Sequence, residues 1–315
     1  MTGLHPRGPV FIVGAPRSGT TLLQYMLRSH PSLSLPTGES HFIIPYYRAA
    51  NSHDTLNSPG QVSALLADMR RRNAEFIETD LHGIEFNEDT LGRIFFEQGH
   101  TNVRDVLTAL FERNAAGEGK QRWGDKTPYY VLHLPKLLQW WPDAQIIHVI
   151  RDGRDVALSL FARQHDFGVY NTYFAAKYWE HYVEVGHETG RQLPASQYLE
   201  IRYEDLVRTP HETLERICAY LGIIFSESVV DFRKSSMAGK TPLLQQPIQA
   251  GNAEKWRTGM KPAQIRIFEG AVGPTLERFR YPLTTPAPRH PLPLRAAWRW
   301  HNSLATRWYR WRRHA

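Results

Sequence analysis

The stretch PVFIVGAPRSGTTLLQYML, residues 9–27, decides the fold of this chain. Residues 10–13 form an unbroken apolar, β-branched run, which predicts a strand buried on both faces of a parallel sheet. Two glycines and a proline then interrupt regular structure, and from Thr20 apolar residues recur at helical spacing. A strand, a glycine-bearing loop and a helix in this order direct backbone N–H groups at one point, where the helix dipole favours an anion.

The loop has the Gly14-x-x-x-x-Gly19 spacing of a nucleotide-binding P-loop, although Thr20 occupies the position at which such loops carry lysine. Arg17 supplies a cation from within the loop instead. A guanidinium grips two oxyanion oxygens at once and cannot be deprotonated, so it suits a phosphate without help from a metal. The alternative is a strand–turn–helix that arose by chance.

A second strand–helix junction follows at residues 144–160. The stretch AQIIHVI, residues 144–150, predicts a second buried strand, and RDGRDVALSL begins directly after it. Arg151 should therefore lie at the carboxyl edge of the sheet, where open α/β sheets bind their ligands. Ser159 follows about two helical turns later, where its hydroxyl can reach a second anion. A salt-bridged turn is the alternative reading of the Arg-Asp-Gly-Arg sequence.

Two acidic residues of this junction, Asp152 and Asp155, are expected to cap the helix and to steady Arg154.

A further strand is predicted at 197–202. It is followed by Tyr203, which is either a ring that packs on a nucleobase or an ordinary buried aromatic at a strand exit.

Two further polar residues are candidates for chemistry. Glu39 lies just beyond a brief strand at 33–35, where it could act as a general base or as the N-terminal acid of a helix over 42–50. Lys126 lies in WGDKTPYY, residues 123–130, which predicts a proline-punctuated loop. It could present its ammonium group to a bridging oxygen, or it could be a surface lysine in a turn.

Composition and charge limit the class of protein. The chain has 315 residues, of which 42% are hydrophobic, and its alternating helical and strand patterns favour one α/β domain with a parallel sheet. The first eight residues lack an apolar signal segment, and no run of about eighteen apolar residues occurs. Cys218 is the sole cysteine, which excludes an internal disulfide. We therefore expect a cytoplasmic protein.

The net charge of +7 is concentrated at one end of the chain. Residues 289–315 contain seven arginines and no acidic residue, so the remainder is formally neutral. This distribution argues against a nucleic acid as the partner of the globular part.

The region between the first two motifs reads as a helical insert. Residues 51–120 carry helical patterns at 60–76, 88–98 and 103–116, and nothing in them suggests chemistry. Their position next to the loop would allow them to shape an acceptor pocket. Aromatic residues elsewhere could line the same pocket: Tyr129, Tyr130 and Tyr170.

These motifs, in this order, resemble the P-loop-like, PAPS-dependent sulfotransferases, closest in style to bacterial and Golgi-type members. The resemblance covers roughly residues 9–45, 123–165, 196–207 and 245–259. It implies an α/β fold with a parallel sheet flanked by helices. It also implies a donor, 3′-phosphoadenosine 5′-phosphosulfate (PAPS), and no metal.

The resemblance assigns roles to particular residues. It implies a 5′-phosphosulfate site in the first loop, a 3′-phosphate site at Arg151 and Ser159, and a nucleotide contact at Tyr203. A late loop, 234–262, would close over the donor with Lys255 and Arg257. The first loop would contribute Arg17, Ser18, Gly19, Thr20 and Thr21.

The catalytic group implied by the family consists of Arg17, Lys126 and Glu39. Arg17 and Lys126 would stabilise charge on the leaving phosphate oxygen, and Glu39 would take the acceptor's proton. Tyrosyl-protein sulfotransferases also use a serine upstream of the late loop. The matching position here is Lys240, and that role stays open among Ser235, Ser236 and Thr241.

The expected reaction moves a sulfuryl group from PAPS to a hydroxyl or amine. A carbohydrate or glycolipid is the first expectation for the acceptor, and a tyrosyl protein is the alternative. Two other classes compete: a P-loop kinase, disfavoured by Thr20, and a non-catalytic, membrane-associated nucleotide-binding protein.

The chain is expected to divide into one domain over 1–288 and a basic tail over 289–315. Within the tail, 294–311 predicts an amphipathic helix. Its tryptophans and arginines would suit an anionic membrane surface. Docking of the helix on its own domain, or a dimer contact, is the competing expectation. The predicted apolar face comprises Leu294, Trp298, His301, Ala305 and Trp308; the opposite face includes Arg295, Arg299, Asn302, Thr306 and Arg310.

Overall fold

The computed structural model of the chain describes residues 8–49, 55–232, 250–284 and 289–314. The sheet within these residues has five parallel strands in the order β2-β3-β1-β4-β5. The predicted α/β class with a parallel sheet is therefore confirmed. The strands are β1 (Val10–Gly14), β2 (Leu33–Ser34), β3 (Arg122–Lys126), β4 (Gln145–Ile150) and β5 (Tyr198–Arg202).

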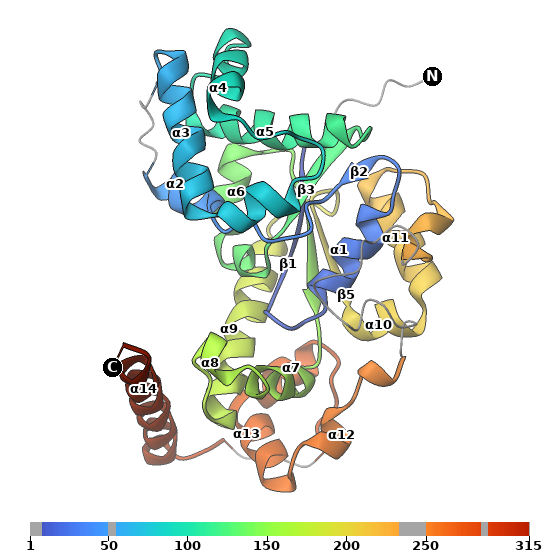
Figure 1. The fold of residues 1–315 in the computed structure, drawn as a ribbon. Coiled ribbons are helices and arrows are strands. Elements are labelled where there is room, and N and C mark those ends of the chain that lie inside the picture. Colours follow the sequence, from blue (N-terminus) through green and yellow to red (C-terminus); the bar gives the residue numbers. More distant parts are fainter. Residues whose placement is uncertain (1–7, 50–54, 233–249, 285–288, 315) are drawn as a thin grey trace.

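Helices cover both faces of this sheet (Figure 1). One face packs against α1, α10 and α11, and the other packs mainly against helices of the insert and against α9 and α13. The helices are α1 (Thr20–Arg28), α2 (Ile43–Ala49), α3 (Pro59–Arg72), α4 (Glu88–Glu97), α5 (Val103–Gly117), α6 (Leu134–Trp140), α7 (Gly153–Phe161), α8 (Gln164–Phe167), α9 (Thr172–Gly190), α10 (Tyr203–Arg208), α11 (Pro210–Leu221), α12 (Trp256–Gly259), α13 (Pro262–Arg278) and α14 (Leu292–His314).

The two strands predicted from apolar runs form the centre of the sheet. Every residue of β1 and of β4 is buried, as expected for strands covered on both faces. Their parallel register pairs Val10 with Gln145 and Gly14 with Val149. The loops that follow both strands therefore leave the sheet at the same edge.

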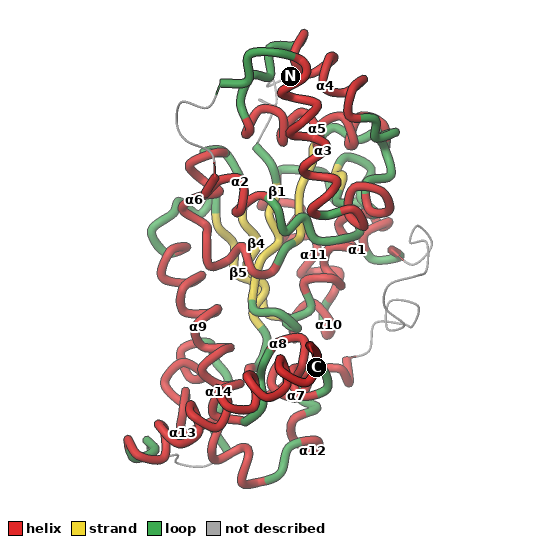
Figure 2. The backbone as a smooth tube through the Cα atoms, turned by 60° about the vertical axis from the view of Figure 1, so that its left-hand side comes forward, coloured by secondary structure: helices red, strands yellow, loops and turns green. Residues whose placement is uncertain are grey.

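Helices α3, α4 and α5 lie within residues 51–120, the segment predicted as a helical insert. Helices α4, α5 and α9 each begin after an asparagine whose side chain accepts a hydrogen bond from the first turn, a standard N-cap. Figure 2 shows the insert helices α3, α4 and α5 gathered at the end of the molecule opposite α12 and α13. Among the described helices, none is long and apolar enough to cross a bilayer.

The prediction of a loop at residues 123–130 was wrong over its first half, because β3 occupies Arg122–Lys126. The segment lacks the apolar run of its neighbours, yet β1 and β2 flank it and supply its hydrogen bonds. Close packing explains the glycine, since a Cβ atom at Gly124 would lie 2.5 Å from the carbonyl oxygen of Val10. Asp125 and Lys126 are consequently buried at the carboxyl end of an inner strand.

Candidate active site

A cavity of about 820 Å³ lies at the carboxyl edge of the sheet. Residues that follow each of the five strands line it, which agrees with the general position of ligand sites in open α/β sheets. In strand order from β1 to β5, these residues include Arg17, Glu39, Pro128, Arg151 and Tyr203.

The first loop enters this cavity through an unusual backbone. Arg17 has a φ of 73° and Gly19 has a φ of 92°, so the loop turns sharply before α1 begins. A side chain at Gly19 is also excluded by packing, because a Cβ atom would lie 2.2 Å from the ring of Tyr203. Left-handed backbone at a non-glycine residue is costly and is concentrated at functional sites.

The other members of the loop divide into two groups. Thr20 and Thr21 line the cavity together with Arg17 and Gly19. The side chain of Ser18 is fully buried inside the loop and does not line the cavity. Ser18 can therefore serve an anion in the cavity only through its backbone.

The two arginine motifs meet in the cavity. Arg17 Nε donates a hydrogen bond to Ser159 Oγ at 2.8 Å, and Arg151 Nη1 donates to the carbonyl oxygen of Arg17 at 3.3 Å. Burial lowers the pKa of Arg17, and the nearby positive charges of Arg163 and Arg151 lower it further. Such a concentration of guanidinium groups favours a multiply charged anion.

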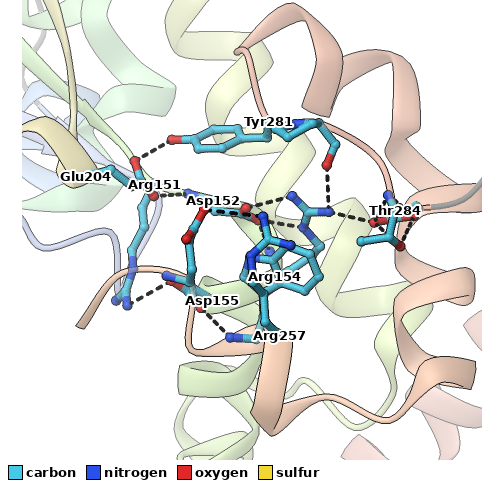
Figure 3. A network of polar contacts seen from close by, with 12 residues as sticks. Arg151, Asp152, Arg154, Asp155, Glu204, Arg257, Tyr281 and Thr284 are labelled. Carbon is cyan, nitrogen blue, oxygen red and sulfur yellow. Dashed lines mark hydrogen bonds and ion pairs between the residues drawn. The ribbon is translucent and has the colours of Figure 1, made fainter. Parts of the chain in front are cut away.

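Arg151 is held from two sides (Figure 3). Its Nη2 atom donates to the carbonyl oxygen of Asn252 at 2.6 Å and lies 3.4 Å from Asp155 Oδ2. Its guanidinium carbon lies 4.4 Å from the centre of the Tyr203 ring. The ring of Tyr203 is buried and packs against Gly19 and Arg151. Part of the Tyr203 side chain also lines the cavity.

Asp155 does not have the expected role of a helix cap. Its carboxylate accepts hydrogen bonds from the backbone N–H groups of Glu254 and Trp256, each at 2.8 Å. It thereby fixes the segment that carries Lys255 into the cavity wall. Asp152 caps α7 as predicted, because its carboxylate accepts from the backbone N–H of Arg154 at 2.9 Å.

A buried network ties this late segment to α7 (Figure 3). Arg154 pairs with Asp152 at 2.8 Å and with Glu269 at 2.6 Å, and its guanidinium carbon lies 3.7 Å from the centre of the Trp256 ring. Figure 3 also shows Tyr281, whose hydroxyl donates to Glu204 at 2.9 Å. Each buried charge in this network has an opposite partner, as burial requires.

Of the two cations predicted in the late loop, Lys255 and Arg257, only the lysine lines the cavity. Arg257 lies outside its lining, where it contacts the Trp256 ring and Glu254. Residues 233–249 lie outside the described part of the chain, and with them the open question of Ser235, Ser236, Lys240 and Thr241.

Glu39 lines the cavity and forms an ion pair with Lys126, which is buried and does not line it. Lys126 Nζ donates to Glu39 Oε1 at 2.5 Å, and only 3% of the lysine side chain is exposed. The other carboxylate oxygen lies 3.1 Å from His41 Nε2. Burial alone would raise the pKa of Glu39, but hydrogen bonds from His41 and Lys126 lower it to about 2. The hydrogen bond between His41 and Glu39 in turn raises the pKa of His41.

Sequence reasoning missed His41 because a histidine two residues after a candidate base carries no recognisable pattern. Beneath the pair, the hydroxyls of Ser40 and Tyr130 lie 2.9 Å apart, and the backbone N–H of Ser40 donates to Thr127 Oγ1 at 3.1 Å. These bonds join the turn after β2 to the end of β3. They hold Glu39 and Lys126 in position.

Further tyrosine side chains line the cavity wall. Tyr129 lines the cavity, as expected, with two residues of α9, Tyr178 and Tyr182. Tyr130 is instead buried in the network beneath Glu39, and Tyr170 lies away from this cavity. Among the described residues, no group of three His, Cys, Asp or Glu side chains comes together as a metal site.

Comparison with known proteins identifies the family. The model of the sulfotransferase family matches residues 9–227, which include all five strands of the sheet and the loops that carry Arg17, Glu39 and Arg151. The chain therefore belongs to the sulfotransferase family.

Individual relatives are distant. The chain is 23% identical to a protein-tyrosine sulfotransferase of Drosophila melanogaster over 70% of its own length and 39% of the relative's. It is 27% identical to the nodulation protein NoeE of Sinorhizobium fredii, over 84% of this chain and 64% of that protein. Thus the chain spans only about two fifths of the Drosophila protein.

A solved structure shows the same fold. The sulfotransferase domain of the olefin synthase from Synechococcus PCC 7002 superimposes with a TM-score of 0.56 and 25% identity. The match covers 85% of this chain and 96% of that domain.

Proposed function

We propose that this chain transfers a sulfuryl group from PAPS to a hydroxyl or amine of an acceptor molecule. One observation carries the proposal. Arg17 and Arg151, from the ends of two adjacent strands, face one cavity that Glu39 also lines, and the buried Lys126 lies 2.5 Å from the Glu39 carboxylate. A doubly phosphorylated nucleotide with a reactive group at one end fits such an arrangement.

The arginine motifs would bind the two ends of the donor. Arg17 and the N–H groups of residues 18–21 would surround the 5′-phosphosulfate, because they lie at the N-terminus of α1. Arg151 and Ser159 would hold the 3′-phosphate, with Lys255 beside them. Phosphate oxygens would compete for the hydrogen bond that Arg17 donates to Ser159 at 2.8 Å.

Glu39 and Lys126 would perform the chemistry as a coupled pair. Glu39 is a weak base while Lys126 and His41 hold both of its oxygens. When Lys126 turns to the phosphate oxygen that leaves sulfur, Glu39 loses a positive partner and its pKa rises. Glu39 would then take the acceptor's proton as the acceptor attacks sulfur. The sulfur–oxygen bond to phosphate breaks, and its electron pair stays on adenosine 3′,5′-bisphosphate.

We propose a carbohydrate or glycolipid hydroxyl as the acceptor. The aromatic wall formed by Tyr129, Tyr178 and Tyr182 supports this choice, since flat rings with polar tips suit ligands that are both apolar and hydroxylated. A tyrosyl residue of a protein is the second candidate. It is favoured by the match to protein-tyrosine sulfotransferases.

Thermal unfolding in the presence of nucleotides tests the function. Adenosine 3′,5′-bisphosphate should raise the midpoint temperature, because a ligand that binds only the native state stabilises it. ATP with Mg²⁺ should raise it much less. Stabilisation by ATP with Mg²⁺ alone would instead support the kinase alternative.

Transfer of label from ³⁵S-labelled PAPS into a cell extract separates an enzyme from a non-catalytic binding protein. We expect labelled acceptor to appear with the wild-type chain and not with the doubly substituted Glu39→Gln, Lys126→Met chain. Binding of the bisphosphate without any transfer of label would overturn the assignment as an enzyme.

A further inference from the structure

Helix α14 docks on its own domain through one face. Asn302 is only 3% exposed, and its side chain accepts a hydrogen bond from the Tyr170 N–H at 2.8 Å and donates to the Gly168 carbonyl oxygen at 2.9 Å. The Trp298 ring stacks on Tyr173, with ring centres 5.2 Å apart. The expectation that this helix docks on its own domain is therefore confirmed for one of its faces.

The predicted faces of this helix were wrong. Trp298 and Trp308 were placed on one apolar face, but Trp298 packs against the domain while Trp308 is 57% exposed. Asn302, expected on the polar face, is among the buried residues. The reason is that the hydrogen bonds of Asn302 to the loop at 168–170, together with the stacking of Trp298 on Tyr173, orient the helix.

The opposite face presents an aromatic stripe to solvent. Trp300, Leu304, Trp308 and Trp311 are 69%, 42%, 57% and 67% exposed. Spacings of four, four and three residues place them on one side of the helix. Among the described residues, Ile224 is the only exposed large apolar side chain outside α14.

Arginines border this stripe. By helical geometry, Arg307 and Arg310 lie to one side of it and Arg312 lies to the other, with its guanidinium carbon 4.8 Å from the centre of the Trp308 ring. Residues 289–315 contain no acidic residue. The face therefore combines an apolar centre with positive edges.

We propose that this face of α14 binds the surface of an anionic membrane, with the helix parallel to the surface. Tryptophan rings favour the headgroup region of a bilayer, and arginines beside them attract anionic lipids. Docking through Asn302 holds the helix folded before it meets the membrane. A symmetric dimer through this face is disfavoured, because the partner copy would bring the same arginines against it.

Sedimentation of the full chain with vesicles tests the proposal and requires no sulfuryl transfer. The wild-type chain should bind phosphatidylcholine vesicles that contain phosphatidylglycerol at least about tenfold more tightly than pure phosphatidylcholine vesicles. The triple variant W300S/W308S/W311S should lose binding to both. The triple variant R307Q/R310Q/R312Q should lose the preference for anionic vesicles.

Matched surface variants control for general effects. Ile224→Ser removes an exposed apolar side chain elsewhere, and R93Q/R113Q/R216Q removes three exposed arginines from other helices. Both should bind as the wild type does, and circular dichroism should show all variants folded. Vesicle binding that survives both α14 triple variants would overturn the proposal. The proposal would also be overturned if the wild-type chain self-associated without binding vesicles and the tryptophan triple variant no longer self-associated.

Discussion

Replacement of Lys126 by methionine is expected to lower the turnover number about a hundredfold, which corresponds to ~3 kcal/mol of lost transition-state stabilisation. Methionine has nearly the length of lysine without its charge, so it fills the buried site without creating a cavity. Affinity for PAPS should change little, because negative charge develops on the oxygen that Lys126 contacts only as its bond to sulfur breaks. Steady-state kinetics and calorimetric titration measure the two quantities separately.

The matched control for this variant is Lys261→Met, which removes an exposed lysine at the start of α13. It should retain wild-type turnover. Turnover of Lys126→Met close to that of the control would show that Lys126 serves only as the structural partner of Glu39.

Glu39→Gln is the second substitution with a large expected effect. Glutamine keeps the size of glutamate and can still accept a hydrogen bond from Lys126, but it cannot take the acceptor's proton. We expect turnover to fall at least about a hundredfold, within the range for loss of a general base. Glu97→Gln, an exposed substitution on α4, is the control. Near-normal transfer by Glu39→Gln would remove Glu39 as the base.

The pH dependence of Lys126→Met provides an independent check on this coupling. Lys126 and His41 together lower the pKa of Glu39 to about 2. Loss of Lys126 should raise that pKa, so Glu39 would become protonated at a higher pH. The acid limb of the profile of residual activity should therefore shift upward relative to wild type. An unchanged acid limb would contradict the proposed coupling.

Strands could be predicted from the local sequence where they are buried and mainly apolar. The runs at 10–13 and 144–150 predicted β1 and β4 because strands covered on both faces consist mainly of apolar residues. Strand β3 could not be found in this way. Its Gly124, Asp125 and Lys126 are in the sheet because of pairing with neighbours and close packing, which no local pattern records.

The site was predictable to the extent that it depends on strand ends. Arg17 and Arg151 follow adjacent parallel strands, so their convergence follows from topology. The bonds of Asp155 to the backbone at 254 and 256 join residues about a hundred positions apart. No spacing rule predicts such a contact. The orientation of α14 likewise depends on the contacts of Asn302 with a distant loop.

The central claim is that two strand-end arginines hold the two phosphates of one nucleotide. Calorimetric titration of the wild-type chain and of Arg151→Gln, each with adenosine 3′,5′-bisphosphate and with 5′-AMP, tests it most directly. The wild type should prefer the bisphosphate by at least about tenfold, since a hydrogen bond to a charged group contributes roughly 1.5–3 kcal/mol. Arg151→Gln should lose that preference while its affinity for 5′-AMP stays the same. Equal loss of affinity for both nucleotides, or an intact preference in the variant, would contradict the account.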